Sequence, residues 1–403
     1  MNTCSVCKEE KVKVLLDFGM QPVCNRFLKK PEEVKGEYKH SLMIGQCLTC
    51  GSIQVVNSFP VAELKPEHTW IVRYAEPEEH LDNLADKIAN LAGLNPESKF
   101  LGISFKDVSL IERMKHKGFE NVHCLDTKKD LLITEIAGVE SVQDKFTVEK
   151  SRELVKKHGR YDIIIARHIL EHVYSPKDFM DSLKELLKPE GYIIIEVPGC
   201  DQAFELFDYT IPWEEHTLYF TRQSFKHFFG FAGLNIESFE EIDYPLESSL
   251  IVIARLKKKQ NVSDSSLFPT KDFLSKELEL GDAFAKGFSR REKELKNYLS
   301  DKKGVALFGA GHLACSYINF FDIKEQIDFV VDDDPNKKGL FMAGSGIPIF
   351  GSGALVEKNI GLCLLSLNPR NEDKVIQKNQ AFINNKGIFL SIFPSSKHAL
   401  KLG

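Results

Sequence analysis

Two short apolar runs, residues 161–166 (YDIIIA) and 192–198 (YIIIEVP), enclose a segment with helical periodicity. Continuous apolar runs are typical of strands that are buried on both faces of a sheet. Between them, apolar side chains recur at steps of three or four residues, which indicates one buried face of a helix. These positions are Phe179, Leu183, Leu186 and Leu187. The pattern predicts a β-α-β unit, and a crossover of this length implies parallel strands.

Polar residues follow the first of these strands directly, namely Arg167, His168, Glu171 and His172. Ligands of open α/β sheets bind beyond the carboxyl ends of the strands, so this cluster marks an expected small-molecule site. The order of strand, LEH, helix, KPEG and strand resembles the second half of a class I methyltransferase domain, a type that binds S-adenosylmethionine. The alternative is another doubly wound α/β domain.

The length of 403 residues is typical of two or three domains. Lysines are mixed with glutamates, and the formal net charge is -5, so we expect no nucleic-acid partner. No apolar run approaches the ~20 residues of a membrane span. The first residues include charged side chains from Lys8 to Lys11, which is unlike a secretory signal, and we expect a cytoplasmic protein.

Four of the nine cysteines form two Cys-x-x-Cys pairs, Cys4 with Cys7 and Cys47 with Cys50. Two such pairs complete a tetrahedral four-thiolate shell, which zinc favours, and a closed shell indicates a structural metal. The segment of about 60 residues is too small for a large core, and a metal compensates for that. The alternative is a set of unrelated free thiols.

The stretch FGMQPVCNRFL between the cysteine pairs, from Phe18 to Leu28, completes a wider resemblance. With the cysteines, it resembles the amino-terminal domain of nucleotide-sugar C-methyltransferases. That family implies an α/β chain of three parts: a small zinc-binding module (1–65), a central class I methyltransferase domain with a doubly wound sheet (66–258), and a Rossmann-like domain with a leading helix (259–403). The polar segment 256–266 marks the last boundary.

The predicted first strand of the methyltransferase domain, residues 100–103, precedes the turn in which such domains carry glycines. Ser104 and Val108 stand at those glycine positions. We expect weak cofactor binding, with Phe105 turned away from the site toward the helix that follows. Asp126 ends the next strand and either binds cofactor ribose hydroxyls or caps a turn. The expected cofactor contacts are Gly102, Ser104, Asp126 and Arg167.

The segment around His216 resembles the family's Tyr-x-Glu-His signature. Glu215 and His216 match its glutamate and histidine, and Trp213 replaces its tyrosine. The resemblance implies that His216 is the base and that His172 and Glu215 assist it. A neutral histidine can remove the acidic proton beside the carbonyl of a 4-keto sugar, and donors then stabilise the enolate. The alternative for both histidines is a packing or capping role. The family also implies an aromatic residue before position 80, near His68, Trp70 and Tyr74.

The strand predicted at residues 305–308 leads into a Gly-x-Gly-x-x-Ala turn that opens a helix, a plausible phosphate site. An acidic run that begins at Asp332 ends the next strand. In the resembled family the nucleotide-sugar lies between this domain and the methyltransferase domain. The expected substrate contacts are Trp213, Gly309, Gly311, Asp332, Asn368 and Arg370.

The sequence therefore predicts a C-methyltransferase of carbohydrate biosynthesis that uses S-adenosylmethionine and zinc and acts on a nucleotide-linked keto-deoxysugar. The alternatives are a non-methylating relative with a degenerate cofactor turn that binds or isomerises a nucleotide-sugar, and a partner protein without catalysis. Neither the nucleotide nor the oligomeric state follows from the sequence.

Overall fold

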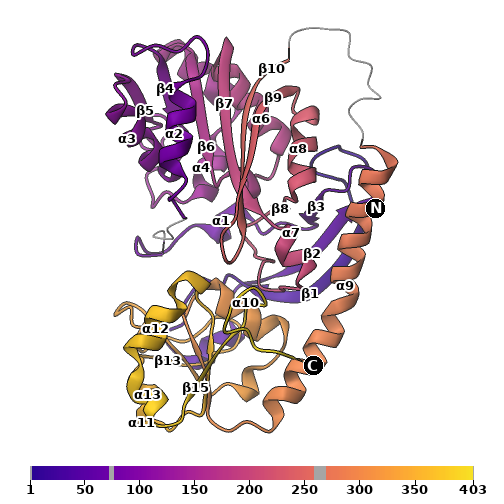
Figure 1. Ribbon diagram of the computed structural model, residues 1–403, viewed down its shortest axis with the longest axis vertical. Helices are drawn as coiled ribbons and strands as arrows, with labels where there is room; N and C mark the ends of the chain where they lie inside the picture. The colour runs from indigo at the N-terminus through magenta and orange to yellow at the C-terminus, as the bar shows by residue number, and fades with distance from the viewer. Residues whose placement is uncertain (1, 72–76, 258–268, 403) are drawn as a thin grey trace.

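The computed structural model describes residues 2–71, 77–257 and 269–402, which form three sheets (Figure 1). Tyr74 and most of the predicted boundary segment 256–266 lie outside the described residues. Among the described helices, none combines the length and the apolar character needed to cross a membrane. The α/β architecture predicted from the sequence is confirmed, with the helices mainly against the middle and carboxyl-terminal sheets.

The amino-terminal sheet is antiparallel and has the strand order β1-β2-β3-β8. Its last strand comes from the middle of the chain, where Tyr219 pairs with Ile53. The amino-terminal module and the middle domain therefore share one sheet. The strands are β1 (Val12–Pro22), β2 (Lys39–Cys47), β3 (Ile53–Val55) and β8 (Leu218–Tyr219), and the short helix α1 (Val61–Leu64) follows the third of them.

The middle sheet has the order β5-β4-β6-β7-β10-β9, with the first four strands parallel and β10 antiparallel to both of its neighbours. Alternate residues of β6 pack into two cores: Ile163 and Ile165 face α2 and α3, whereas Ile164 and Ala166 face α5 and α6. Both faces are covered, which explains the continuous apolar runs in the sequence. The predicted β-α-β unit is confirmed, except that Leu187 begins β7 instead of ending the helix. The strands are β4 (Lys99–Gly102), β5 (Asn121–Cys124), β6 (Tyr161–Arg167), β7 (Leu187–Gly199), β9 (Leu234–Ile242) and β10 (Ser248–Leu256). The helices are α2 (Leu81–Ala89), α3 (Val108–His116), α4 (Val139–Lys145), α5 (Val148–His158), α6 (Pro176–Leu186), α7 (Asp201–Glu205) and α8 (Arg222–Phe231).

The carboxyl-terminal sheet is parallel, with the order β13-β12-β11-β14-β15, which confirms a Rossmann-like domain. It lies at the opposite end of the molecule from the middle sheet (Figure 1). The strands are β11 (Val305–Phe308), β12 (Phe329–Val331), β13 (Ile349–Phe350), β14 (Leu362–Leu365) and β15 (Ile388–Ser391). The helices are α10 (His312–Phe320), α11 (Ala354–Glu357), α12 (Glu372–Lys378) and α13 (Gln380–Asn384).

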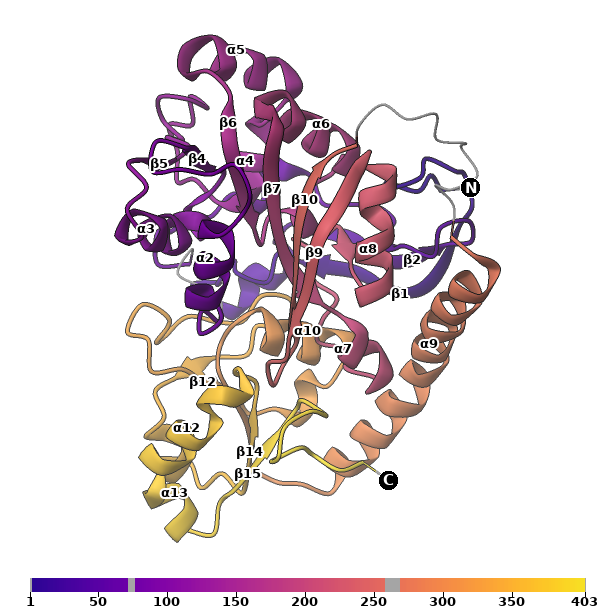
Figure 2. The ribbon, with the colours of Figure 1, turned by 45° about the horizontal axis from the view of Figure 1, so that its top comes forward.

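The 30-residue helix α9 (Lys271–Ser300) runs along one side of the molecule and contacts all three parts (Figures 1 and 2). Near its start, Glu277 accepts hydrogen bonds from Thr221 in the middle domain. Gly281 lies against Gln46 of the amino-terminal sheet so closely that a Cβ would come within 2.3 Å of the amide oxygen. Further along, Phe288 stacks on Phe321 of the carboxyl-terminal domain. The helix therefore fixes the positions of the parts that enclose the site.

Candidate active site

The four paired cysteines meet as predicted. The Sγ atoms of Cys4 and Cys50 lie 3.6 Å apart, as do those of Cys7 and Cys47, and all four lie within 4.8 Å of one another. Four sulfurs at the Zn–S bond length of ~2.3 Å occupy a tetrahedron with edges of about 3.8 Å, so the thiol set fits one zinc ion. Each cysteine of the first Cys-x-x-Cys pair lies next to one of the second pair, so the cluster joins the start of the chain to the end of β2.

A cavity of about 620 Å³ lies where the three parts of the chain meet. Its volume suits a ligand much larger than a single sugar ring. The middle domain provides the loop after β6 and the loop before β8, and the carboxyl-terminal domain provides the start of α10. Among the lining residues are Asn25, Phe27, Trp70, Phe105, Lys106, Glu140, His168, Glu171, His172, Trp213, Glu215, His216, Gly311, His312 and Lys337.

The two predicted catalytic histidines come together in this cavity. The ring centroids of His172 and His216 lie 4.7 Å apart, with the rings nearly perpendicular. Their loops are fastened by Thr217, whose backbone N–H donates to the carbonyl of Glu171 at 2.7 Å and whose hydroxyl donates to the carbonyl of Val173 at 2.7 Å. Burial lowers the pKa of His216 well below its usual range, and the neighbouring His172 adds to this effect. A neutral imidazole is the form that accepts a proton.

Three carboxylates surround this pair. Glu140 Oε1 lies 2.9 Å from Nδ1 of His172, and Glu171 Oε1 lies 4.0 Å from its Nε2. Burial raises the pKa of Glu215 well above its usual range, and the charge of Glu140 raises it further. Two overlapping sets of these groups have ligand atoms close enough to hold one metal ion: Glu140 with His172 and Glu215, and Glu171 with His172 and His216.

Trp213 joins this cluster to the carboxyl-terminal domain. Its ring lies 5.0 Å from that of His216 and stacks on His312, the first residue of α10, at 4.3 Å and 21°. The sequence analysis assigned no role to His312 or Glu140. Both lie far along the chain from the histidine motifs, and only the folded arrangement of α4 and α10 brings them to the cavity.

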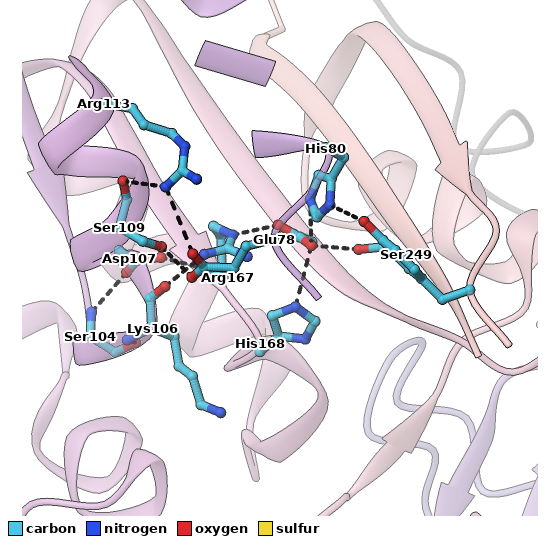
Figure 3. Close-up of polar contacts among 12 residues, drawn as sticks. Glu78, His80, Ser104, Lys106, Asp107, Ser109, Arg113, Arg167, His168 and Ser249 are labelled. Atoms are coloured by element: carbon cyan, nitrogen blue, oxygen red, sulfur yellow. Dashed lines mark hydrogen bonds and ion pairs between the residues drawn. The ribbon is translucent and has the colours of Figure 1, made fainter. Parts of the chain in front are cut away.

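The four predicted cofactor contacts, unlike the predicted catalytic residues, do not lie on the cavity wall. Arg167 is fully buried and donates through Nε to Glu196 and through Nη1 to the carbonyl of Lys106 at 2.7 Å (Figure 3). A Cβ at Gly102 would lie 2.8 Å from both Asp107 and Cys124. Of the cluster predicted after β6, His168, Glu171 and His172 line the cavity, whereas Arg167 does not.

Asp126 and Ser104 satisfy local backbone groups. Asp126 accepts the N–H groups of Lys128 and Lys129 at 3.0 Å, which matches the turn-capping alternative and lowers its pKa. Ser104 caps the short helical turn after β4 and accepts the N–H of Lys106. The cofactor roles of Gly102, Ser104, Asp126 and Arg167 therefore stay predictions, and in this structure the polar groups described above are bonded within the protein.

The turn after β4 tolerates the missing glycines. Ser104 has φ -135° and Val108 has φ -54°, and both are ordinary conformations for residues with a Cβ. The predicted orientation of Phe105 is wrong: its side chain is 37% exposed and lines the cavity, and Lys106 lines it as well. The Asp107 carboxylate points into the turn and accepts the backbone N–H groups of Ile103 and Ser104. Phe105 and Lys106 lie on the other side of the turn and line the cavity.

Of the six predicted substrate contacts, Trp213 and Gly311 line the cavity. Gly309 has φ +108° and packs against Ser366, so its role is conformational. Asp332 accepts the N–H of Ala310 at 2.9 Å and pairs with Lys337. Asn368 caps its own turn, and Arg370 pairs with Glu79. The last four therefore shape the edge of the carboxyl-terminal sheet and do not line the cavity.

Three family models match consecutive parts of the chain. Residues 4–64 match the model described as "Putative zinc binding domain", residues 78–238 match "Methyltransferase domain", and residues 257–394 match "C-methyltransferase C-terminal domain". The C-methyltransferase NovU of Streptomyces niveus is 21% identical over 411 residues, which cover 98% of this chain and 96% of that protein.

Among solved structures, a SAM-dependent methyltransferase from Aquifex aeolicus is 18% identical, with a TM-score of 0.29 over 49% of this chain and 98% of that one. An S-adenosylmethionine-dependent methyltransferase from Clostridium acetobutylicum is 11% identical, with a TM-score of 0.31 over 47% of this chain and 95% of that one. From the matches along its length, the chain is similar to C-methyltransferases: it has a zinc-binding domain, a methyltransferase domain and a C-methyltransferase C-terminal domain, and it is a methyltransferase that uses S-adenosylmethionine.

Proposed function

We propose that this C-methyltransferase acts on a nucleotide-linked keto-deoxysugar and that His216 removes the proton beside the sugar carbonyl. The observation that carries the proposal is the placement of the His172–His216 pair in a cavity shared by all three parts of the chain. A substrate with a sugar at one end and a nucleotide at the other spans such a cavity.

The wall of the cavity suits the two ends of this substrate. Arg26, Lys65 and Lys337 line it. Each is paired with a carboxylate, namely Glu63, Glu135 and Asp332, and a diphosphate would exchange these partners for its own oxygens. The start of α10 also lines it, with Gly311 and His312 on the cavity wall, and the amino-terminus of a helix favours an anionic group. Phe27 and Trp70, whose ring centroids are 5.7 Å apart, add aromatic surface for a base or a sugar.

The chemistry that these residues perform is proton removal from carbon. His216 takes the proton from the carbon beside the carbonyl, and the electron pair of that C–H bond moves into an enolate. The carbonyl oxygen then carries the negative charge, which donors in the cavity stabilise. The carbon that loses its proton is the one to which C-methylation adds a methyl group.

Hydrogen exchange tests this step separately from methylation. The full-length protein is mixed with thymidine diphosphate-4-keto-6-deoxyglucose in deuterated water, and incorporation of deuterium beside the carbonyl is followed by NMR. We expect exchange that is catalysed by the wild type. Absence of exchange with this and with other nucleoside-diphosphate 4-keto sugars would contradict the proposal.

A further inference from the structure

A second feature of the cavity is the meeting of Glu140, Glu171 and Glu215 around one imidazole. Glu140, Glu171 and His172 are all buried, with 4%, 1% and 6% of each residue exposed. Carboxylates removed from water are costly unless they are paired or bind a cation. The ligand atoms of Glu140, His172 and Glu215 all lie within 4.8 Å of one another.

The contact between Glu140 and His172 has the geometry of two ligands. Glu140 Oε1 and His172 Nδ1 are 2.9 Å apart. The two atoms form an ion pair when the imidazole is protonated, and neither has a hydrogen-bond partner among the described residues. Two electron-rich atoms that are close together but not aligned as donor and acceptor are arranged as neighbours in the shell of a shared ion.

The other nitrogen of His172 has the surroundings expected of a metal ligand. Its Nε2 lies 4.0 Å from Oε1 of Glu171, and Glu171 Oε2 is buried without a hydrogen-bond partner among the described residues. Metal-bound histidines usually direct their second nitrogen to a carboxylate, which fixes the ring. Glu171 lies beyond hydrogen-bond distance of this nitrogen and nearer to Nδ1 of His168, at 3.6 Å, so it would become an orienting carboxylate only by closing on His172 when an ion is bound.

We propose that Glu140, His172 and Glu215 bind a divalent cation in the active-site cavity, separate from the zinc of the four cysteines. Two carboxylates and one imidazole suit Mn²⁺ among the common metals. His216 stays outside this ligand set and is left to act as the base. Resting on the proposed function, the cation would accept the carbonyl oxygen of the keto sugar as a further ligand and stabilise the enolate as a Lewis acid.

Binding is tested with Mn²⁺ itself. The full-length protein is treated with EDTA, shown by elemental analysis to keep its zinc, and titrated with Mn²⁺ while the free ion is followed by electron paramagnetic resonance. We expect one Mn²⁺ per chain. Glu140→Gln and Glu215→Gln each remove a ligand charge without changing size, and we expect each to weaken binding by ~100-fold, with Glu171→Gln weakening it by ~10-fold.

The matched control is Glu279→Gln, which removes the same charge from an exposed position on α9 and should leave binding unchanged. Each variant is compared with the wild type by circular dichroism, and a variant that has lost its fold is replaced by the other ligand variant. Absence of saturable Mn²⁺ binding, or equal binding by the wild type and both ligand variants, would overturn the site.

Deuterium exchange with the keto-sugar probe separates the role of the cation from the proposed function. We expect Mn²⁺ to accelerate exchange by the wild type by at least tenfold and not to accelerate exchange by Glu140→Gln. Exchange that is equally fast without Mn²⁺ would overturn the Lewis-acid role and leave the proposed function intact. Bound Mn²⁺ without any exchange would contradict the proposed function and leave the metal site intact.

Discussion

The carboxylate of Asp107 accepts the backbone N–H of Arg167 at 2.9 Å and so ties the carboxyl end of β4 to that of β6. Its other oxygen accepts the N–H groups of Ile103 and Ser104 at 2.8 Å. Figure 3 shows Asp107 between Ser104 and Arg167. One buried side chain therefore links β4 and β6, the two neighbouring strands between which the strand order reverses.

Replacing Asp107 should destabilise the middle domain. In Asp107→Ala, the buried N–H groups of Ser104 and Arg167 lose their acceptor, whereas that of Ile103 keeps the carbonyl of Ile165 at 3.0 Å. Each such loss costs ~1 kcal/mol or more, so we expect a loss of about 2 kcal/mol in the free energy of unfolding. Urea denaturation measures it. The control is Asp82→Ala, which removes an exposed ion pair with Arg113 and should change stability by less than ~1 kcal/mol. Equal losses in both variants would contradict the bridging role.

The turn after β4 predicts which substitutions improve binding of S-adenosylmethionine. Phe105→Ala and Lys106→Gly remove side chains that line the cavity, and we expect binding about tenfold tighter, equivalent to ~1.4 kcal/mol. Ser104→Gly and Val108→Gly should have little effect, because both residues have negative φ angles. Calorimetry with pure protein measures all four. If Phe105→Ala and Lys106→Gly bind no more tightly than the wild type, these two side chains do not limit binding of the cofactor.

His216 is tested by replacement with asparagine, which keeps polarity but removes the nitrogen that accepts a proton. Loss of a general base costs ~10²-fold or more in rate. We expect deuterium exchange into the keto-sugar probe to fall by that factor. The control is His227→Asn, since His227 lies on α8 and does not line the cavity. Exchange by His216→Asn at the wild-type rate would exclude His216 as the base.

The zinc prediction concerns Cys47, which joins the end of β2 to the metal shell. We expect about one zinc per chain by elemental analysis, and its loss in Cys47→Ser, with a lower unfolding temperature, because metal binding contributes to folding free energy there. Cys363→Ser is the control, since this cysteine is buried in the carboxyl-terminal domain. A fully folded protein without metal would contradict a structural role for zinc.

Glu277 should make stability depend on pH. Burial raises its pKa to about 7, well above the value expected in the unfolded chain. The folded state therefore binds this proton more tightly, so its contribution to stability is complete at low pH and is lost as the pH rises through 7. Glu277→Gln cannot ionise. We expect the variant to match the wild type in unfolding temperature at pH 5 and to exceed it at pH 8; a constant difference would contradict the assignment.

The sequence predicts the parts of the site that depend on local pattern. The spacing of Cys4, Cys7, Cys47 and Cys50 determines the thiol cluster, and the strand–LEH pattern places His172 at a strand end. Buried strands and long helices are also readable, because apolar periodicity follows directly from burial on one or two faces.

The parts that the sequence does not predict depend on packing between distant segments. Asp126 is an example, since a carboxylate after a strand can bind a ribose or cap a turn, and only the folded loop decides. Phe105 is another, because its direction follows from the bonds of Asp107 two residues later. Glu140 reaches the histidines only because α4 packs beside the loop after β6, a relationship with no local signal.

The pairing of β8 with β3 has a consequence for how the chain is made. During synthesis, the amino-terminal strands leave the ribosome long before Leu218 and Tyr219, so the outer edge of β3 has no partner at first. Unpaired strand edges are sites at which newly made chains associate wrongly. The amino-terminal module therefore completes its sheet only after the loop that carries His216 has been synthesised. Ordering of this catalytic loop and completion of the sheet then occur together, late in the folding of the new chain.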